Sequence, residues 1–449
     1  MNPDEKETVR VRIADIFASG ALESLRVLAE ELHPSDLADL VEGLEEEGQV
    51  ALLSALPKEL ASEALAEMEE GDERSALLGA LSPEKSAELI HELADDDAAD
   101  LIGELEPPVQ QKILEALPYD EAGELRDLLR YDEESAGGLM TTELVAVEGS
   151  LTAQQALEEV RRQGSEVEDF YTVFVVDADH RLLGTLRLDD LVIADPASGI
   201  DQLVEEPIAT ALPDLDQEQV GKLISRYNIV SLPVVTEDGE LLGRITFDDV
   251  IDVIEAEQTE DLFRLAGISD DDDLRHTWHE SVRVRLPWLV LNLMTAALAA
   301  SVILLFEDVI EEVITLAFLA PIIAAMGGSS GTQSLAITIL RITVEGSRGA
   351  RGIVGKEILI GLVNGAVLGA GIALLALALD GDPRLGLVVL LAMWGNQVVA
   401  GFAGAFVPAT LDRIGVDPSV ASSVFVHTLT DLCGFFLLLG LASKLLLGA

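Results

Sequence analysis

The sequence has almost no cysteine and few basic residues. Its single cysteine, Cys433, lies in an apolar segment, which excludes an intramolecular disulfide and indicates no redox chemistry. Only 28 Lys and Arg stand against 81 Asp and Glu, giving a formal net charge of −53. A chain this acidic repels nucleic acid and attracts cations, so we expect no nucleic-acid partner. General acidity, typical of halophilic organisms with molar salt in the cytoplasm, is a second explanation of the same charge.

Other absences narrow the function further. The N-terminus has no apolar core of the kind found in signal peptides, so we expect no cleaved leader and a cytosolic location for residues 1–279. The sequence lacks a phosphate-binding loop and a nucleophile–base constellation, which argues against an enzyme. It also lacks a His/Cys cluster, which argues against a zinc or copper site.

Apolar and acidic residues are segregated along the 449-residue chain, which has room for about three domains. Only twelve acidic residues lie between Glu280 and the end. The same part holds five segments long enough to cross a hydrocarbon core of about 30 Å. They are residues 286–306, 313–340, 358–379, 385–411 and 418–443. We therefore predict a five-helix transmembrane domain over residues 280–449.

Basic residues in the flanks and short loops predict the orientation. The side that carries the N-terminal region holds most of them: Arg275, Arg283, Arg285, Arg341, Arg348, Arg351, Lys356 and Arg413. The opposite side has Arg384 and Lys444, with an acidic loop at 307–312. We expect a multi-pass protein of the cytoplasmic membrane with its N-terminus in the cytosol. An odd number of spans places the C-terminus outside.

The predicted spans carry more than apolar residues. The second contains Pro321 and the polar, glycine-rich run 327–334, for which we predict irregular backbone against protein or a water-filled path. In the third, Gly365 and Gly369 form a small-xxx-small pair suited to close helix contact. Packing alone explains these glycines, but not the amides of the second and fourth spans, Gln333, Asn396 and Gln397.

Asp431 is the strongest candidate for a functional residue. A carboxylate inside a bilayer costs several kcal/mol and by default marks a functional site. Asp417 lies fourteen residues earlier, about 21 Å along the same predicted helix and nearly on one face with Thr428 and Asp431. A structural Asp bonded to a neighbouring hydroxyl or amide is the alternative. His427, one turn away, is a second candidate ligand or a residue facing neighbouring helices. Such oxygen ligands suit Mg²⁺ or Ca²⁺.

Two further domains precede the membrane segments. Residues 1–130 show short amphipathic helices in a loose repeat, which predicts an acidic α-superhelix. A β-β-α pattern then occurs twice, and this duplication is similar to a pair of cystathionine-β-synthase (CBS) modules at 131–197 and 198–257. CBS pairs are regulatory sensors, often of adenine nucleotides, so ATP is an alternative ligand although no nucleotide signature is present.

A long acidic helix follows the second module, and we assign it to residues 248–279 as a connection to the membrane domain. Its carboxylates are either a solvated face or part of a cation site. The predicted fold is thus a multi-domain membrane protein: an α-superhelical domain, an α+β CBS pair, a connecting plug helix and five transmembrane helices.

Over essentially its whole length the chain resembles the MgtE family of magnesium channels. Three pieces carry the resemblance: Thr-Phe-Asp-Asp-Val at 246–250 leading to Glu260-Asp261; Pro321 with Gly-Gly-x-x-Gly-x-Gln-Ser at 327–334; and Val-Asp-Pro at 416–418 with Thr-Leu-Thr-Asp at 428–431. The resemblance implies a homodimer with a pore on its two-fold axis. Asp431 is then the central ligand of hydrated Mg²⁺, with Thr428 beside it and Asp417 nearer the cytosolic mouth.

The resemblance also implies two larger residue sets. The pore-lining set is Gly328, Ser329, Gly331, Gln333, Asn396, Ser423 and His427. The regulatory cation ligands are Asp249, Asp252, Glu260 and Asp261, joined by Asp216, Asp95, Asp97 and Asp100. The expected function is Mg²⁺ uptake through a channel that cytosolic Mg²⁺ closes. A Na⁺- or H⁺-coupled transporter of divalent cations and a non-conducting, membrane-anchored CBS sensor are the alternatives.

The sequence departs from the family pattern at several positions. Ser329 and Thr332 carry hydroxyls where the family usually has amides, and Ser423 stands where an amide can occur. Asn228 occupies a place where an acid can occur. These departures leave open the preferred ion among Mg²⁺, Mn²⁺, Co²⁺ and Ca²⁺, and the number of regulatory ions.

Overall fold

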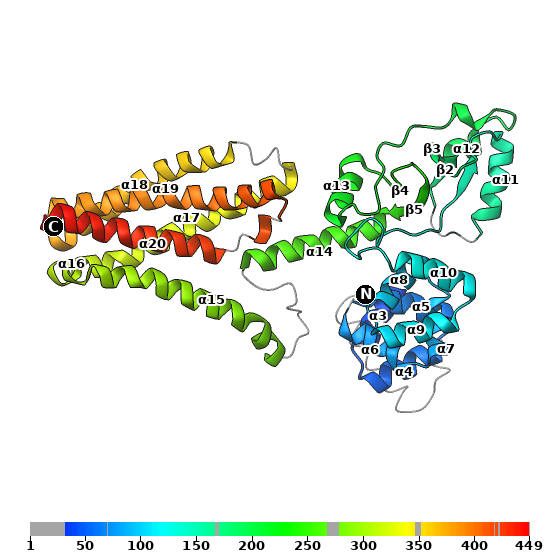
Figure 1. The fold of residues 1–449 in the computed structure, drawn as a ribbon, viewed down its shortest axis with the longest axis horizontal. Helices are drawn as coiled ribbons and strands as arrows, with labels where there is room; N and C mark the ends of the chain where they lie inside the picture. The colour runs from blue at the N-terminus through cyan, green and yellow to red at the C-terminus, as the bar shows by residue number, and fades with distance from the viewer. Residues whose placement is uncertain are drawn as a thin grey trace. The chain divides into compact units, whose positions relative to one another are not determined.

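The computed structural model describes residues 32–448, with gaps at 70, 166, 168–169, 267–277, 346–351, 417 and 421–422. The chain forms two compact units, Met1–Glu255 and Ala256–Ala449 (Figure 1). The boundary between them falls inside one continuous helix, α14 (Phe247–Ala266).

The described N-terminal region is entirely helical. Proline occupies the first position of three helices, at Pro34, Pro83 and Pro107, where its missing N–H is not needed. Leu and Ile side chains on one face of each helix fill a common core, with Leu37, Leu89 and others fully buried. This confirms the predicted helical domain. The helices are α3 (Pro34–Glu42), α4 (Glu46–Ala55), α5 (Lys58–Ala66), α6 (Asp72–Ala80), α7 (Pro83–Ile90), α8 (Asp95–Gly103), α9 (Pro107–Ala116) and α10 (Tyr119–Leu128).

The rest of the first unit contains the two β-β-α modules. In the first, β1 pairs parallel with β2 and β2 pairs antiparallel with β3. In the second, β4 pairs antiparallel with β5, with Ser231 opposite Thr246. Each hairpin leads directly into an acidic helix, α12 or α14, as predicted. The elements are β1 (Ala146–Glu148), α11 (Ala153–Gln163), β2 (Thr172–Val176), β3 (Leu182–Arg187), α12 (Leu188–Ile193), a 3₁₀ turn (Ile200–Gln202), α13 (Gln217–Tyr227), β4 (Ser231–Val235) and β5 (Leu241–Thr246).

The cores of the first unit show how its parts are joined. One hydrophobic core extends from Leu37 in α3 to Ile245 in β5 and Val250 in α14. The first CBS module has a separate core around Val173 and Leu186. The helical domain therefore packs against the second module, and this packing brings the acidic start of α8 near the acidic start of α14.

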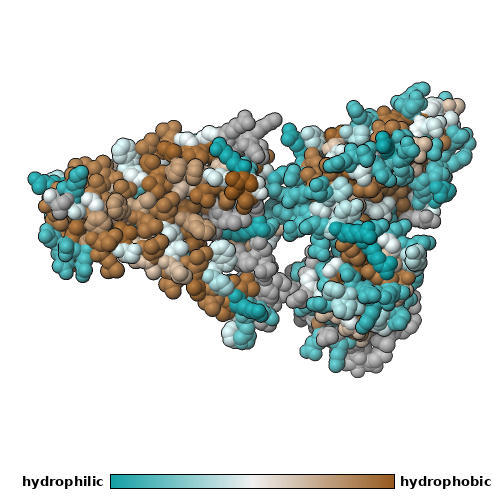
Figure 2. Space-filling model, in the orientation of Figure 1, coloured by the Kyte–Doolittle hydropathy of each residue, from teal (hydrophilic) through white to brown (hydrophobic). Residues whose placement is uncertain are grey.

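Within its described residues, the second unit contains five helices long and apolar enough to cross a membrane, which confirms the predicted number of spans. Figure 2 shows hydrophobic atoms over much of their surface. Buried contacts hold α17, α18, α19 and α20 together, whereas most of α15 is exposed. The elements are α15 (Trp278–Leu305), α16 (Glu307–Glu312), α17 (Thr315–Glu345), α18 (Ile353–Asp380), α19 (Pro383–Ile414), a 3₁₀ turn (Pro418–Val420), α20 (Ser423–Ala442) and a π-helical turn (Ser443–Leu447).

Glycine allows α18 and α19 to pack closely. A Cβ atom added at Gly361 would lie 2.5 Å from the carbonyl oxygen of Gln397, and one at Gly369 would lie 2.9 Å from that of Leu390. Gly365, between them, faces Trp394 in the same way. The predicted small-xxx-small contact of Gly365 and Gly369 is confirmed, and Gly361, one turn earlier, also takes part in it.

Three local predictions are wrong. The run 327–334 is not irregular, because α17 is one continuous helix from Thr315 to Glu345 and its glycines serve close packing instead. The last span does not begin at Pro418: a 3₁₀ turn covers Pro418–Val420 and α20 begins at Ser423. The acidic loop at 307–312 is a short helix, α16, which buries Val309 in the membrane unit.

Candidate functional site

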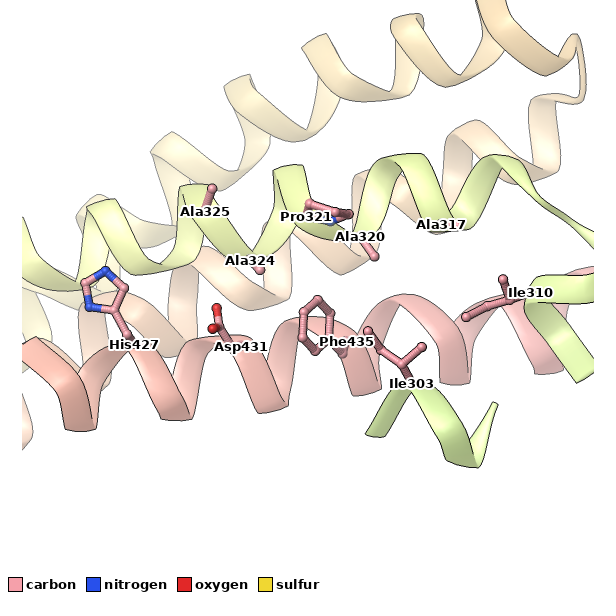
Figure 3. A pocket seen from close by; sticks show the side chains of 10 residues that line it. All are labelled: Ile303, Ile310, Ala317, Ala320, Pro321, Ala324, Ala325, His427, Asp431 and Phe435. Atoms are coloured by element: carbon pink, nitrogen blue, oxygen red, sulfur yellow. The ribbon is translucent and has the colours of Figure 1, made fainter. Parts of the chain in front are cut away.

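Asp431 lies on α20 and is half-buried. It lines a cavity of about 470 Å³ between α15, α16, α17 and α20. Most of the lining is apolar, including Pro321, Ala324 and Phe435. Figure 3 shows the carboxylate and the imidazole of His427 on the side of α20 that faces α17. The cavity thus presents one acid and one imidazole in otherwise apolar walls.

Hydrogen bonds orient the groups next to Asp431. The Nδ1 atom of His427 lies 2.8 Å from the carbonyl oxygen of Ser423. A carbonyl only accepts, so Nδ1 carries a hydrogen, and Nε2 is an acceptor in the neutral form of the ring. The hydroxyl of Thr428 donates to Val424 O at 2.7 Å, and that of Thr430 donates to Val426 O at 3.0 Å. Both hydroxyls therefore bond to their own helix and keep a lone pair for another donor or a cation.

The two amides of α19 lock it to α17. Asn396 Nδ2 donates to Ile323 O, and Gln397 Nε2 donates to Met326 O, both at 3.0 Å. Both side chains are fully buried. A Cβ atom at Gly327 would lie 2.3 Å from Asn396 Nδ2, so glycine is needed where the amide crosses. Asn396, predicted to line the pore, does not line the cavity of Asp431.

The other predicted pore residues occupy several places. Gly328 is buried, and a Cβ there would lie 2.5 Å from Cδ2 of His427. Gly331 packs against Val426, whereas Ser329 and Gln333 are exposed on α17. Ser423 is half-buried at the start of α20, and Asp417 lies outside the described residues. The structure thus brings together Asp431, His427, Thr428, Ser423 and Gly328 along α20 and the facing side of α17.

The C-terminal end of α14 belongs to the membrane unit and packs against it. Arg264 Nη1 donates to Ser419 Oγ at 3.2 Å. Leu265 packs on a cluster that contains Leu335 and Val426. Two predicted regulatory residues lie on this half of the helix: Glu260 pairs with Arg264, and Asp261 is one residue further. A segment outside the five spans thus ends against α17 and α20.

In the first unit, carboxylates from α8 and α14 crowd together. Loss of hydration, together with the charge of Asp249 and against a lowering effect of Arg74, raises the pKa of Asp97 to about 6. Burial raises the pKa of Asp96, with Asp97 and Asp249 adding to the effect. Loss of hydration also raises the pKa of Asp249 and of Asp252. Among the described residues, loss of hydration and repulsion between these carboxylates outweigh the attraction of Arg74 at Asp97.

Three other predicted regulatory residues have different surroundings. Asp95 accepts from Thr141 Oγ1 at 2.5 Å, from Thr142 N at 3.1 Å and from the Thr142 hydroxyl, so it joins α8 to the segment before β1. Asp216 accepts from Glu218 N at 3.0 Å as the N-cap of α13. Asp100 is half-buried on α8.

No ready-made metal site is present in the described residues, where no three His, Cys, Asp or Glu side chains converge on one point. Asp96 nevertheless keeps a buried oxygen, Oδ1, without a hydrogen-bond partner. An orphaned carboxylate oxygen among acids of raised pKa matches the chemistry of a hard cation ligand set.

Comparison with known proteins identifies the family. Residues 32–134 match the family described as MgtE intracellular N domain, residues 136–196 and 200–256 match the CBS domain, and residues 320–441 match the family described as divalent cation transporter. The magnesium transporter MgtE of Thermus thermophilus is 35% identical over 448 residues, which cover 98% of this chain and 99% of that protein. The chain belongs to the MgtE family.

Further MgtE proteins agree with this assignment. The magnesium transporter MgtE of Enterococcus faecalis is 35% identical over 326 residues, 72% of each chain. Among solved structures, the cytosolic domain of the Mg²⁺ channel MgtE in complex with ATP is 36% identical, with a TM-score of 0.52, and covers 54% of this chain and 99% of that one. The soluble part of a magnesium transporter is 30% identical with the same TM-score, and covers 56% and 99%.

Sequence reasoning missed two members of the carboxylate cluster. Glu67 and Asp248 both raise the pKa of Asp97, and Glu67 also raises that of Asp252. Asp248 adjoins a residue that the MgtE resemblance already marked. Glu67 follows α5, far from α14 in sequence, so only the folded helical domain shows that it belongs to the cluster.

Proposed function

We propose that this chain is a Mg²⁺ channel for uptake across the cytoplasmic membrane, closed by cytosolic Mg²⁺. The observation that carries the proposal is the carboxylate of Asp431, held at a cavity among the membrane helices of a chain that belongs to a family of divalent cation transporters. A carboxylate at that depth is costly unless it serves a cation. With the inside negative, the membrane potential favours entry of a divalent cation by about 4.6 kcal/mol per 100 mV.

The proposal includes a homodimer. One chain offers a single carboxylate at the cavity, and hydrated Mg²⁺ is usually bound by one or two carboxylates through its water shell. A second copy related by a two-fold axis would supply the second Asp431. We assign Asp431, Asp417 and Thr428 to the ion path, with the N-terminus in the cytosol and the C-terminus outside.

The proposed closing of the channel by Mg²⁺ depends on the crowded carboxylates of the first unit. Two unit charges 4 Å apart repel by about 4 kcal/mol at an effective dielectric near 20, so Asp97, Asp249 and Asp252 destabilise the packed arrangement of α8 and α14. A cation held by them offsets this repulsion. Because α14 continues to Arg264 at the membrane helices, loss of the cation releases the end of α14 that closes the path.

ATP is proposed as a second ligand, at the CBS pair. It is supported by the related cytosolic domain of the Mg²⁺ channel MgtE, which was solved in complex with ATP. Equilibrium dialysis of the full chain against ATP, with and without Mg²⁺, tests this assignment.

Flux into proteoliposomes tests the channel. We expect Mg²⁺ entry by the intact chain, suppression of that entry by Mg²⁺ on the side of the first unit, and loss of entry in Asp431→Ala. Glu312→Ala, an exposed acid of α16, is the matched control and should conduct normally. Unchanged flux in Asp431→Ala would remove this residue from the path.

The same liposomes separate the alternatives. A coupled transporter would need a Na⁺ or H⁺ gradient in fixed ratio to the divalent ion, whereas a channel needs only the electrochemical gradient of its ion. A non-conducting sensor would show no flux in any variant. Asp249→Asn with Asp252→Asn should show flux that no longer depends on Mg²⁺ on the side of the first unit, since the repulsion and the ligands are lost together.

A further inference from the structure

The membrane unit contains a second cavity, of about 270 Å³, between α17, α18 and α19. It shares no lining residue with the cavity of Asp431. Its lining is rich in polar side chains, which is unusual for helices that face lipid on one side and protein on the other. They include Ser330, Gln333, Lys356, Glu357, Asn364 and Gln397.

Glu357 is the central group of this cavity. The residue is only 6% exposed, and within the described ranges its carboxylate has neither a hydrogen bond nor an ion pair. Removing an ionised carboxylate from water without a partner costs several kcal/mol. A group that supplies positive charge would remove that cost.

Gln397 adds a second unsatisfied acceptor at the same cavity. The residue is fully buried, and its Nε2 atom is used in the bond to Met326 O. Its Oε1 atom has no partner among the described residues. The unpaired carboxylate of the buried residue Glu357 and the unpaired amide oxygen of Gln397 therefore meet one polar cavity, and each would be satisfied by the same cation.

We propose that this cavity binds an alkali metal cation, Na⁺ or K⁺. The donors on offer are one carboxylate, the amide oxygens of Gln397, Gln333 and Asn364, and the hydroxyl of Ser330, all hard ligands. One carboxylate balances one positive charge, whereas Mg²⁺ would leave a net charge in a poorly solvated place and gives up its water reluctantly. The volume holds an ion with several waters, at about 30 Å³ each.

Lys356 is the rival partner of Glu357, since it lines the same cavity. It is exposed, and no salt bridge joins the two side chains in the described structure. A lysine near a membrane surface extends its ammonium toward water. In the proposed site Lys356 competes with the bound cation through like-charge repulsion, so its removal should strengthen binding.

The test is thermal unfolding of the full chain in detergent with EDTA. KCl or NaCl is compared with N-methylglucamine chloride at equal ionic strength, because that organic cation screens charge but is not a compact metal ion that several oxygens can coordinate. We expect the unfolding midpoint to rise by a few degrees and to saturate with either alkali salt. Glu357→Gln should lose this increment, and Asp431→Asn, in the other cavity, should keep it.

Two further variants sharpen the result. In Lys356→Gln the rise of the unfolding midpoint should saturate at a lower salt concentration. In Asn364→Ala, at an exposed lining position, it should saturate at a higher one. The second variant keeps the test usable if Glu357→Gln fails to fold. Equal midpoints in alkali and organic salt for the intact chain would overturn the proposal. So would a lower midpoint of Lys356→Gln in every salt, since Lys356 would then be the partner of Glu357. The outcome is independent of Mg²⁺ flux and of the proposed channel.

Discussion

At the scale of the residue, the informative groups are acids that the fold places against other acids. Asp249 of α14 raises the pKa of both Asp96 and Asp97 on α8. Arg74 is the opposing charge, and it is already held by Glu104 at 2.5 Å. The folded first unit thus keeps protons up to a higher pH than the unfolded chain, and the proposed cation would replace those protons.

This arrangement predicts a pH dependence of stability. The pKa of Asp97 is about 6 in the folded chain against 3.8 ordinarily, so the folded state holds more protons between these values and stability falls as the pH rises from about 4 to about 6. Because the residue Asp97 is exposed to solvent, the effect of its raised pKa is reduced, and we expect a loss on the order of 1 kcal/mol. Unfolding of the full chain in EDTA across this range measures it.

Asp97→Asn should flatten that slope, and Asp238→Asn, an exposed acid in the turn before β5, should leave it unchanged. Added Mg²⁺ should restore stability above about pH 6 in the intact chain. Equal slopes in the two variants would show that another group titrates.

At the scale of the element, the close contact of α18 with α19 is the feature with the clearest consequence. Gly361→Val should destabilise the membrane unit by about 1–3 kcal/mol, because a Cβ there meets the backbone of Gln397 at 2.5 Å. Gly371→Ala, on the same helix with no atom within 4 Å of the added Cβ, is the matched control. Unfolding midpoints of both variants in detergent test the contact, and equal midpoints would contradict it.

Elements of this kind were largely predictable from the sequence. Length and apolarity identified all five spans, and the alternation of β-branched residues identified both hairpins. Two features could not be predicted from the neighbouring sequence, because they depend on other helices. The backbone of 327–334 depends on α19, since Asn396 and Gly404 approach those glycines. The cavity beside Glu357 is formed by α17 and α19 together with α18, so an acid near the start of α18 gave no sign of it in the sequence.

At the scale of the whole molecule, charge and apolarity divide between the two units. All but twelve of the 81 acidic residues precede Glu280. Repulsion among them reaches about 10 Å in 0.1 M salt and about 3 Å in 1 M salt. Molar salt should therefore stabilise the first unit much more than the second.

The aromatic residues allow the two units to be followed separately. All four tyrosines lie in the first unit and all three tryptophans in the second. We expect the unfolding midpoint reported by tyrosine absorbance to rise with KCl by several degrees more than the midpoint reported by tryptophan fluorescence. Parallel shifts of the two signals would contradict a charge-driven effect. N-methylglucamine chloride serves as the control for the alkali cation itself.

The boundary between the units lies within α14, so the two units are joined by a continuous helix and not by a loop. A helix has a fixed phase of 100° and 1.5 Å per residue, so one alanine inserted after Glu255 turns everything beyond it by 100°. Seven inserted residues restore the phase to within about 20° but add about 10.5 Å. If α14 transmits the effect of Mg²⁺ through its rotational phase, Mg²⁺ control of flux should be lost with one extra residue and return with seven. If α14 acts through its length, seven extra residues should impair Mg²⁺ control more than one does.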